Sequence, residues 1–209
     1  MLRFLPLVLA AGACLGPALA QTGPAPRGEG ARPGETRPAD PKAPRPTPRR
    51  PSSLDELFER LAASKDEAEA KGIANLIERR WARSGSDTAD LLMSRAGEAL
   101  GGDDAALAIE LLDRATQLKP DCAEAWHRRA AAFYRLEDPV DALADLNRAL
   151  TYEPRHFNAW MALGHVRMAA GDKRRALEAY RKALALHPHL EDVKRIVDRI
   201  APDIDGRDL

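Results

Sequence analysis

The sequence predicts an all-α fold built from antiparallel helix pairs that stack on one another. Residues 123–156 and 157–190 are two consecutive units that match position by position over 34 residues, and a fixed period of that length is typical of stacked helical repeats. Only 5% of the residues are aromatic, and the abundance of Ala and Leu suits close-packed helices better than sheets. A Pro residue closes each unit, where it would end the second helix of a pair.

Each unit carries large and small side chains at fixed places. The matched positions are Trp126 with Trp160, Ala130 with Gly164, Ala142 with Ala176, Leu143 with Leu177, Leu146 with Tyr180, Ala149 with Ala183 and Pro154 with Pro188. One period earlier, residues 89–122 place Leu92, Ala96, Ala108, Ile109, Leu112, Ala115 and Pro120 in the same order. We expect the small residues where two helices cross closely, with the large residues filling the space beside them.

This pattern resembles the tetratricopeptide repeat family. The resemblance implies a right-handed superhelix with three repeats in residues 87–190, namely 89–122, 123–156 and 157–190. It also implies that the first helices of successive pairs line a concave groove. Two short stretches, EPRHF at 153–157 and SGS at 84–86, resemble small exported alphaproteobacterial proteins of this family, whose activity is undefined. The resemblance therefore implies an architecture and a groove without identifying the ligand.

Residues 1–20 are predicted to be a secretory signal peptide. Arg3 precedes an apolar run of about a dozen residues, which is too short to span a bilayer, and the stretch ALA at 18–20 is a small-x-small cleavage site. Cleavage there implies a periplasmic protein without a transmembrane segment after signal removal. The alternative is a lipoprotein modified at Cys14, which Ala11 disfavours because a lipobox usually has Leu at that place.

Residues 21–53 are predicted to be a disordered Pro/Arg-rich linker. They contain nine Pro, four Gly and no large apolar residue, so they cannot bury enough apolar surface to offset the entropy of ordering. Seven basic and three acidic residues give a net charge of 7 − 3 = +4. We interpret the segment as a solvated spacer. The alternatives are a weak contact with anionic envelope surfaces and a docking peptide.

Residues 54–86 are predicted to form a degenerate N-terminal helix pair. Ser52 or Ser53 can cap the first helix, whose apolar stripe consists of Leu54, Leu57, Phe58 and Leu61. A second helix from about 66 to 84 would turn Ala70, Ile73, Ala74, Ile77 and Trp81 inward. We expect the pair to stack as an atypical first repeat, because a terminal repeat meets water on one face.

The three repeats are predicted as helix pairs 88–100 with 104–117, 123–136 with 138–151, and 157–170 with 173–186. Gly101, Gly102 and Gly171 are expected at helix C-termini that need a left-handed residue. Asp103, Asp138 and Asp172 are expected as N-caps. A last helix over 190–200 should cap the array within the C-terminal segment 191–209, with residues 201–209 frayed.

Charge and motif content argue against several functions. The 32 basic and 32 acidic residues lack the basic excess of a nucleic-acid binder. The chain has no nucleophile elbow, P-loop, Gly-rich dinucleotide turn or HExxH motif, so we predict no enzyme, catalytic site or cofactor. Cys122 is the one thiol after the signal peptide; we favour burial at a repeat junction over pairing between molecules.

Two histidines on the first helices, His127 and His165, are predicted to be solvated groove residues rather than metal ligands. His127 and His165 lie on neighbouring first helices and could approach one another, but a metal site needs three or four ligands. His156 and His187 fall in the turns between repeats. We therefore expect no metal site.

The candidate partner-binding residues lie on the first helices, at spacings that place each set on one face. They are Met93, His127, Tyr134, Arg135, Asn158, Met161, His165 and Met168. Some members of the family bind a C-terminal carboxylate through Lys, Asn and Arg on these helices. The matching places here hold Met93, Gly97, Arg128, Asn158 and Ala162, so most of that clamp is absent.

We interpret the sequence as a non-enzymatic protein-protein interaction module of the bacterial envelope, whose groove binds a peptide or protein segment. No nucleic-acid partner is expected. The alternative is a structural or assembly subunit that self-associates or docks on an envelope complex.

Overall fold

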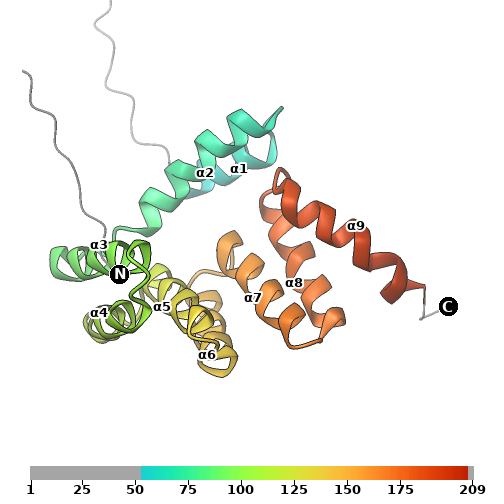
Figure 1. The fold of residues 1–209 in the computed structure, drawn as a ribbon. Helices are drawn as coiled ribbons and strands as arrows, with labels where there is room; N and C mark the ends of the chain where they lie inside the picture. Colours follow the sequence, from blue (N-terminus) through green and yellow to red (C-terminus); the bar gives the residue numbers. More distant parts are fainter. Residues whose placement is uncertain (1–52, 207–209) are drawn as a thin grey trace, which may run out of the picture. The chain divides into compact units, whose positions relative to one another are not determined.

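The computed structural model describes residues 53–206, which contain nine α-helices and no strand (Figure 1). The helices are α1 (Leu54–Ala62), α2 (Glu67–Trp81), α3 (Asp87–Gly101), α4 (Ala105–Leu118), α5 (Ala123–Arg135), α6 (Pro139–Tyr152), α7 (Phe157–Ala169), α8 (Lys173–Leu186) and α9 (Glu191–Asp205). The predicted signal peptide and nearly all of the predicted linker lie outside the described residues. No helix within 53–206 is long and apolar enough to cross a membrane.

Three antiparallel pairs, α3–α4, α5–α6 and α7–α8, stack in chain order, and α9 packs on α8 (Figure 1). The predicted fold class is thereby confirmed. Each pair leaves an apolar face that only a neighbour can cover. Accordingly, the cores of the array run across helix pairs: one cluster joins Ala130 and Leu146 of the second pair to Ala159 and Val166 of the third.

Small residues allow the close helix crossings, as predicted. Ala142 and Ala176 are completely buried. At Gly164, a methyl group built on the backbone would lie 2.4 Å from Cε1 of Tyr180. The Tyr180 ring thus occupies the space that a side chain at position 164 would need, which is the alternation of large and small residues that dense packing requires.

The turn inside each pair has a left-handed residue at the same place in the repeat. These residues are Asp103 (φ 63°), Glu137 (φ 58°) and Gly171 (φ 79°). The prediction is confirmed for Gly171 but wrong for Gly102, whose φ is −88°. It is also wrong that Asp103 caps the next helix. Asp104 accepts from the Leu107 N–H at 3.0 Å, because Asp103 is held in the left-handed turn.

Polar contacts also join neighbouring pairs. Arg129 makes two hydrogen bonds to Asp145 within its pair and reaches Asp113 of the preceding pair at 2.8 Å. The indoles of Trp126 and Trp160 donate to the carbonyls of Pro120 and Pro154, both at 2.8 Å. These two indole bonds are one period apart, so each tryptophan fixes the turn that precedes its own helix.

The N-terminal pair α1–α2 does not stack as a first repeat, contrary to the prediction. Its apolar cluster includes Phe157 of α7, with Leu186 of α8 packed against it, and contains no residue of α3 or α4. The connection explains the departure. Residues 82–86 link α2 to α3 and include Gly85 at φ 80°, whereas only four residues, one of them Pro, join each later pair to the next helix.

The C-terminal cap is longer than predicted. Helix α9 runs through Pro202 to Asp205, so residues 201–205 are helical rather than frayed. Ala201 and Ile204 pack against the same cluster as Tyr180 and Val193. Apolar burial therefore extends the helix past the proline.

Replacing Gly164 with Ala is expected to lower the free energy of unfolding by about 1–3 kcal/mol, because the new methyl group overpacks the contact with Tyr180. Gly97→Ala is the matched control. A methyl group there meets nothing within 4 Å, and the gain in helix propensity should add about 0.5–1 kcal/mol. Urea unfolding followed by circular dichroism measures both changes. Similar changes in the two variants would contradict the packing described here.

Candidate binding site

His156 lies at the junction of three elements and is completely buried. It occupies the N-cap of α7, where its Nδ1 accepts a hydrogen bond from the Ala159 N–H at 3.2 Å. Because Nδ1 accepts, the proton of the neutral ring lies on Nε2. Nε2 therefore donates to Oε2 of Glu124, 3.0 Å away on α5.

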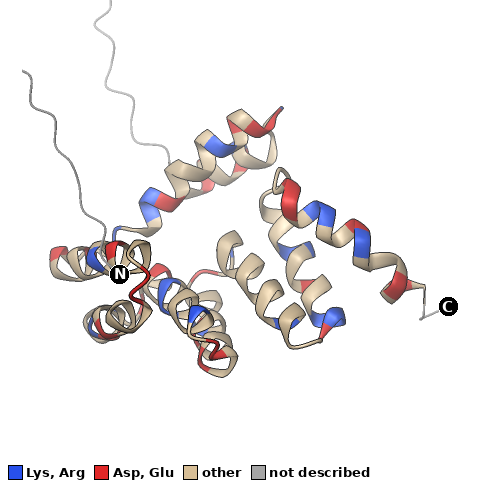
Figure 2. Cartoon of the chain, viewed as in Figure 1, with Lys and Arg blue, Asp and Glu red and all other residues tan. Residues whose placement is uncertain are grey.

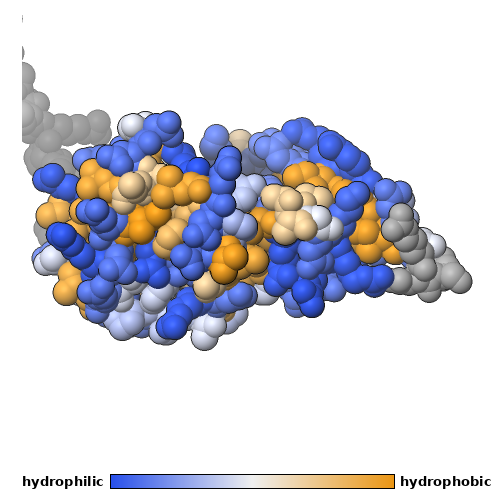
Figure 3. All heavy atoms as spheres, turned by 60° about the horizontal axis from the view of Figure 1, so that its bottom comes forward, coloured by the Kyte–Doolittle hydropathy of each residue, from blue (hydrophilic) through white to orange (hydrophobic). Residues whose placement is uncertain are grey.

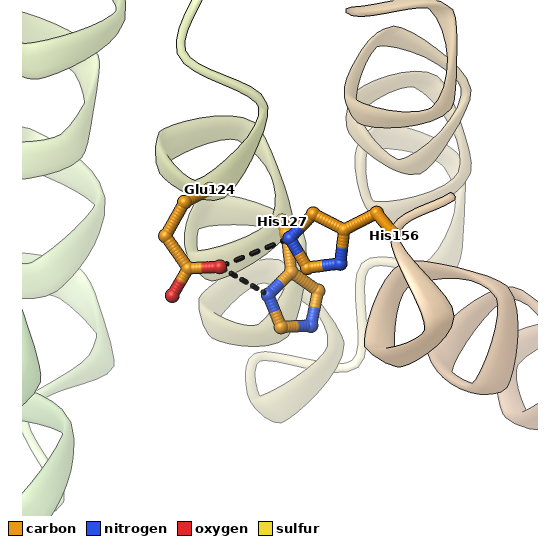
Figure 4. A group of neighbouring side chains, drawn as sticks. All are labelled: Glu124, His127 and His156. Carbon is orange, nitrogen blue, oxygen red and sulfur yellow. Dashed lines mark hydrogen bonds and ion pairs between the residues drawn. The ribbon is translucent and has the colours of Figure 1, made fainter. Parts of the chain in front are cut away.

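Basic side chains lie around the Glu124 carboxylate, and Figure 4 draws two of them, His127 and His156. Arg128, one turn later on α5, donates through Nε to Oε1 at 2.6 Å. His127 Nδ1 lies 3.4 Å from Oε2, but without the geometry of a hydrogen bond. Glu124, His127 and His156 thus form one cluster between the starts of α5 and α7, which we call the imidazole–carboxylate cluster.

The cluster is shielded from solvent, and its charges are shifted accordingly. Burial by itself raises the pKa of Glu124, but the imidazoles of His127 and His156 and the Arg128 guanidinium outweigh it and hold that pKa well below its usual value. Burial lowers the pKa of His156, against the opposing effect of Glu124. The folded state therefore favours an ionised Glu124 beside a neutral His156.

The donor types of the cluster are those of a zinc site, and the three donor atoms lie within 4.8 Å of one another. A metal ion would need the Nε2 lone pair of His156. That nitrogen carries the proton as long as Nδ1 accepts from Ala159. The geometry thus fits a hydrogen-bonded cluster better than a metal centre.

His127 and His165, which were expected to be solvated, each pack against another ring of the chain. His127 lies against His156, with ring centroids 4.7 Å apart, whereas His165 packs edge-on against Tyr180 at 5.4 Å. The sequence analysis also missed Glu124. The signal available was its place on α5 three residues before His127, but nothing in the sequence placed His156 beside it.

Helix α2 covers one end of the predicted groove. The Trp81 ring stacks on His156 with centroids 4.1 Å apart, and Glu78 accepts a hydrogen bond from Asn158 at 2.8 Å. His127 and Asn158, two of the predicted partner-binding residues, are thus both engaged within the chain. Arg128, which matches a clamp position, also donates to the Met93 carbonyl at 3.2 Å.

Three other predicted residues belong partly or fully to the core. Met93 is buried, with its sulfur 3.9 Å from that of Cys122, and the expected burial of Cys122 is confirmed. Met161 and Met168 are partly buried against the cluster formed by Tyr180 and α9. These methionines cover the C-terminal core while leaving part of their surface exposed.

Tyr134 and Arg135 remain open at the other end of the groove. The Tyr134 side chain is 42% exposed. Together with Arg135, Glu137, Pro139, Ala169 and Ala170 it lines a pocket of about 430 Å³, which we call the α5–α7 pocket. Arg135 donates through Nη1 to the Leu100 carbonyl at 2.5 Å, which fixes the guanidinium while leaving its other donors for a ligand.

Comparisons with known proteins agree with this architecture. A family model described as tetratricopeptide repeat matches residues 123–156 and 157–190. A tetratricopeptide repeat-containing protein of Rhizobium etli is 33% identical over 153 residues, which cover 73% of this chain and 75% of that protein. Small glutamine-rich tetratricopeptide repeat-containing protein 2 of Mycosarcoma maydis is 30% identical over 107 residues, 51% of this chain and 30% of that protein.

Two solved structures illustrate the likeness in fold. The first tetratricopeptide repeat domain of Spaghetti (RPAP3) bound to an HSP90 peptide superposes with a TM-score of 0.55 at 21% identity, covering 57% of this chain and 95% of that chain. The Arabidopsis OM64 domain superposes with a TM-score of 0.55 at 23% identity, covering 56% and 98%. At these identities the likeness concerns the fold.

Acid is expected to destabilise the protein in part through His156. Its lowered pKa means that, below the ordinary value of 6.5, the unfolded chain binds a proton that the folded chain resists. Stability is therefore present above that pH and declines below it. The lowered pKa of Glu124 adds a loss that begins below its ordinary value of 4.5.

Melting temperatures at about pH 7.5 and about pH 5.5 test this expectation. His156→Asn keeps an N-cap acceptor but does not titrate, so it should reduce the decline between the two values. Part of the decline should remain, because burial also lowers the pKa values of His165 and His187. A decline as steep as in the wild type would refute the role given to His156.

Proposed function

Because the chain belongs to the tetratricopeptide repeat family, whose domains are typically non-enzymatic interaction modules, we propose that it binds a peptide or protein segment in its groove in the bacterial envelope. The observation that carries the proposal is the α5–α7 pocket. It places an exposed aromatic ring and a guanidinium beside small side chains of α7.

The chemistry of this pocket suits a peptide. Tyr134 offers an apolar ring with a hydrogen-bonding tip, and Arg135 offers charged donors for a carboxylate. Helix α7 carries a single charged residue, Arg167, and appears almost entirely uncharged in Figure 2. The groove thus has an uncharged wall on α7 and a basic group on α5, which fits an apolar segment with an acidic residue.

The binding mode differs from carboxylate capture through a Lys, Asn and Arg clamp. Asn158 and Arg128, the two residues here that match its chemistry, already bond to Glu78 and Glu124. The partner in this proposal is therefore held at the open end of the groove, around Tyr134.

The envelope setting rests on the sequence of residues 1–20, which has the organisation of a cleaved signal peptide. The mature chain in this proposal begins at Gln21, is periplasmic, and has a basic linker that acts as a solvated spacer, with weak contact to anionic envelope surfaces as the alternative. Lipid attachment at Cys14 is the competing mode of localisation.

Self-association is the second candidate function, favoured by apolar side chains on the first pair. Leu91 is 57% exposed, whereas its equivalents one and two periods later, Ala125 and Ala159, are covered by the preceding pair and are at most 1% exposed. Figure 3 shows apolar areas separated by hydrophilic side chains on one face of the molecule. Light scattering distinguishes the candidates, since a stable oligomer that Leu91→Asp dissolves would favour assembly.

Replacing Tyr134 and Arg135 with Ala should weaken binding of a partner co-purified from native envelopes by at least about tenfold, a loss of about 1.4 kcal/mol. The melting temperature should change little, since both side chains are exposed. Tyr152→Ala is the matched control, because that ring on α6 is 43% exposed and lies outside the pocket. Undiminished binding by the folded double variant would exclude the α5–α7 pocket.

The intact mass of the exported protein is expected to correspond to residues 21–209. A species that begins at Cys14 and carries lipid would overturn both the cleavage site and the soluble periplasmic location.

A further inference from the structure

The pair α1–α2 covers a surface made by the start of α7 and the end of α8, which we call the α7–α8 surface. Trp81 makes the main apolar contact with this surface. The centroid of its ring lies 4.1 Å from that of His156 and 5.1 Å from that of Phe157. Phe58 of α1 lies beside the same indole at 6.0 Å. The face that α2 presents to the array is therefore aromatic and aliphatic, as in a helix docked in a groove.

Acidic side chains surround this apolar contact. Asp55 pairs with Arg155 at 2.6 Å, and Glu78 accepts from Asn158 at 2.8 Å. The Arg155 guanidinium also lies over the Phe58 ring, 4.7 Å from its centroid. The α7–α8 surface thus has a cation, Arg155, and an amide donor, Asn158, beside the aromatic contact with Trp81. The pair α1–α2 supplies the complementary carboxylates.

Some buried polar atoms at the contact between α1–α2 and the α7–α8 surface have no hydrogen-bond partner. Three buried side-chain nitrogens among residues 53–206 lack a hydrogen-bond partner: Trp81 Nε1, His127 Nδ1 and His187 Nδ1. All three lie at or next to this contact, since His127 and Trp81 flank His156 and His187 packs edge-on against Phe157. Buried polar groups are normally satisfied, so these nitrogens are places where another occupant of this surface could add hydrogen bonds.

The connection between α2 and α3 allows α1–α2 to dissociate from the α7–α8 surface. Residues 82–86 form a short connection to α3 with Gly85 in the left-handed region. Contacts of α1–α2 with the rest of the array centre on the α7–α8 surface rather than on the adjacent α3–α4 pair. The pair can therefore leave its seat without breaking the stacking of the three repeats.

We propose that the α7–α8 surface is a docking surface for an acidic amphipathic helix of a partner protein, and that α1–α2 occupies it as an intramolecular competitor. The partner helix carries an aromatic residue in place of Trp81 and carboxylates opposite Arg155 and Asn158. Binding there displaces α1–α2. The surface is distinct from the α5–α7 pocket, so it does not depend on the groove function proposed above.

Cys122 provides a native probe of displacement. It lines a pocket of about 270 Å³ together with Trp81 and Arg83. Its side chain is buried against Met93 of α3 and also lines this pocket, and burial raises the pKa of its thiol. Reaction with a thiol reagent should therefore be slow while Trp81 lines the other side of the pocket. The full chain with Cys14→Ser leaves Cys122 as its single thiol.

Two variants should release α1–α2 by different means. Trp81→Ala removes the aromatic contact. Asp55→Arg with Glu78→Arg removes the two carboxylate contacts while leaving the apolar cluster and the contact of His189 with the Ser64 carbonyl in place. Each should accelerate labelling of Cys122 at least about tenfold, as expected for a more populated local opening. Glu59→Arg, an exposed charge reversal on α1 without a described partner on α7 or α8, is the control and should leave the rate unchanged.

A synthetic peptide of residues 53–84, added in trans, then tests docking itself. It should restore slow labelling of the released variants, whereas the same peptide with Trp81→Ala should not. The proposal is overturned if neither variant speeds labelling, or if labelling is fast and the peptide gives no protection. The peptide should still slow the labelling of Cys122 when Tyr134→Ala and Arg135→Ala are added to a released variant. That result would show that the α7–α8 surface and the α5–α7 pocket are separate, so that one proposal can fail without the other.

Discussion

The hydrogen bond from His156 Nε2 to Glu124 joins α5 of the second helix pair to the N-terminus of α7 in the third, and the N-terminal pair packs on the same ring. One nitrogen of His156 caps α7 and the other donates to α5, while the face of the ring carries Trp81 of α2. Because the cap requires an unprotonated Nδ1, it fixes the tautomer, and the tautomer fixes the direction of the bond to Glu124. A proton on Nδ1 would remove the acceptor that caps α7, whereas the Nε2–H would still donate to Glu124.

The stacked repeats and the N-terminal pair are stabilised in different ways. Within the array, small residues such as Gly164 admit a neighbour's ring, and the apolar faces are shared across pairs. The pair α1–α2 has its own apolar cluster, which extends into the array mainly through Phe157. Its polar bonds to the array join residues far apart in the sequence, and the ion pair of Asp55 with Arg155 is exposed, so that pair contributes little to stability. The stability of the three repeats therefore depends less on α1–α2 than the stability of α1–α2 depends on the repeats.

Most of the fold could be predicted from the sequence, because the repeat period places the same packing requirements every 34 residues. The helix pairs, the caps at Asp138 and Asp172 and the left-handed Gly171 all follow from local chemistry. The seat of α1–α2 could not be predicted, since its contacts with residues 155–158 join segments about 80 to 100 residues apart. The same long-range packing converts His127 and Asn158 from open groove residues into covered ones.

The residues that distinguish this chain are those that depart from the period. Trp126 and Trp160 recur and share one structural task, donating to the proline carbonyl before their helix. The places equivalent to His156 hold Cys122 and Leu190, neither of which makes a side-chain cap. Helices α5 and α7, which are the first helices of the second and third pairs, also differ in charge. Arg135 ends α5, and Ala169 stands in the equivalent place on α7. Since the periodic residues are used in stacking, both proposed binding regions rely on such departures, which lie at the two ends of the groove.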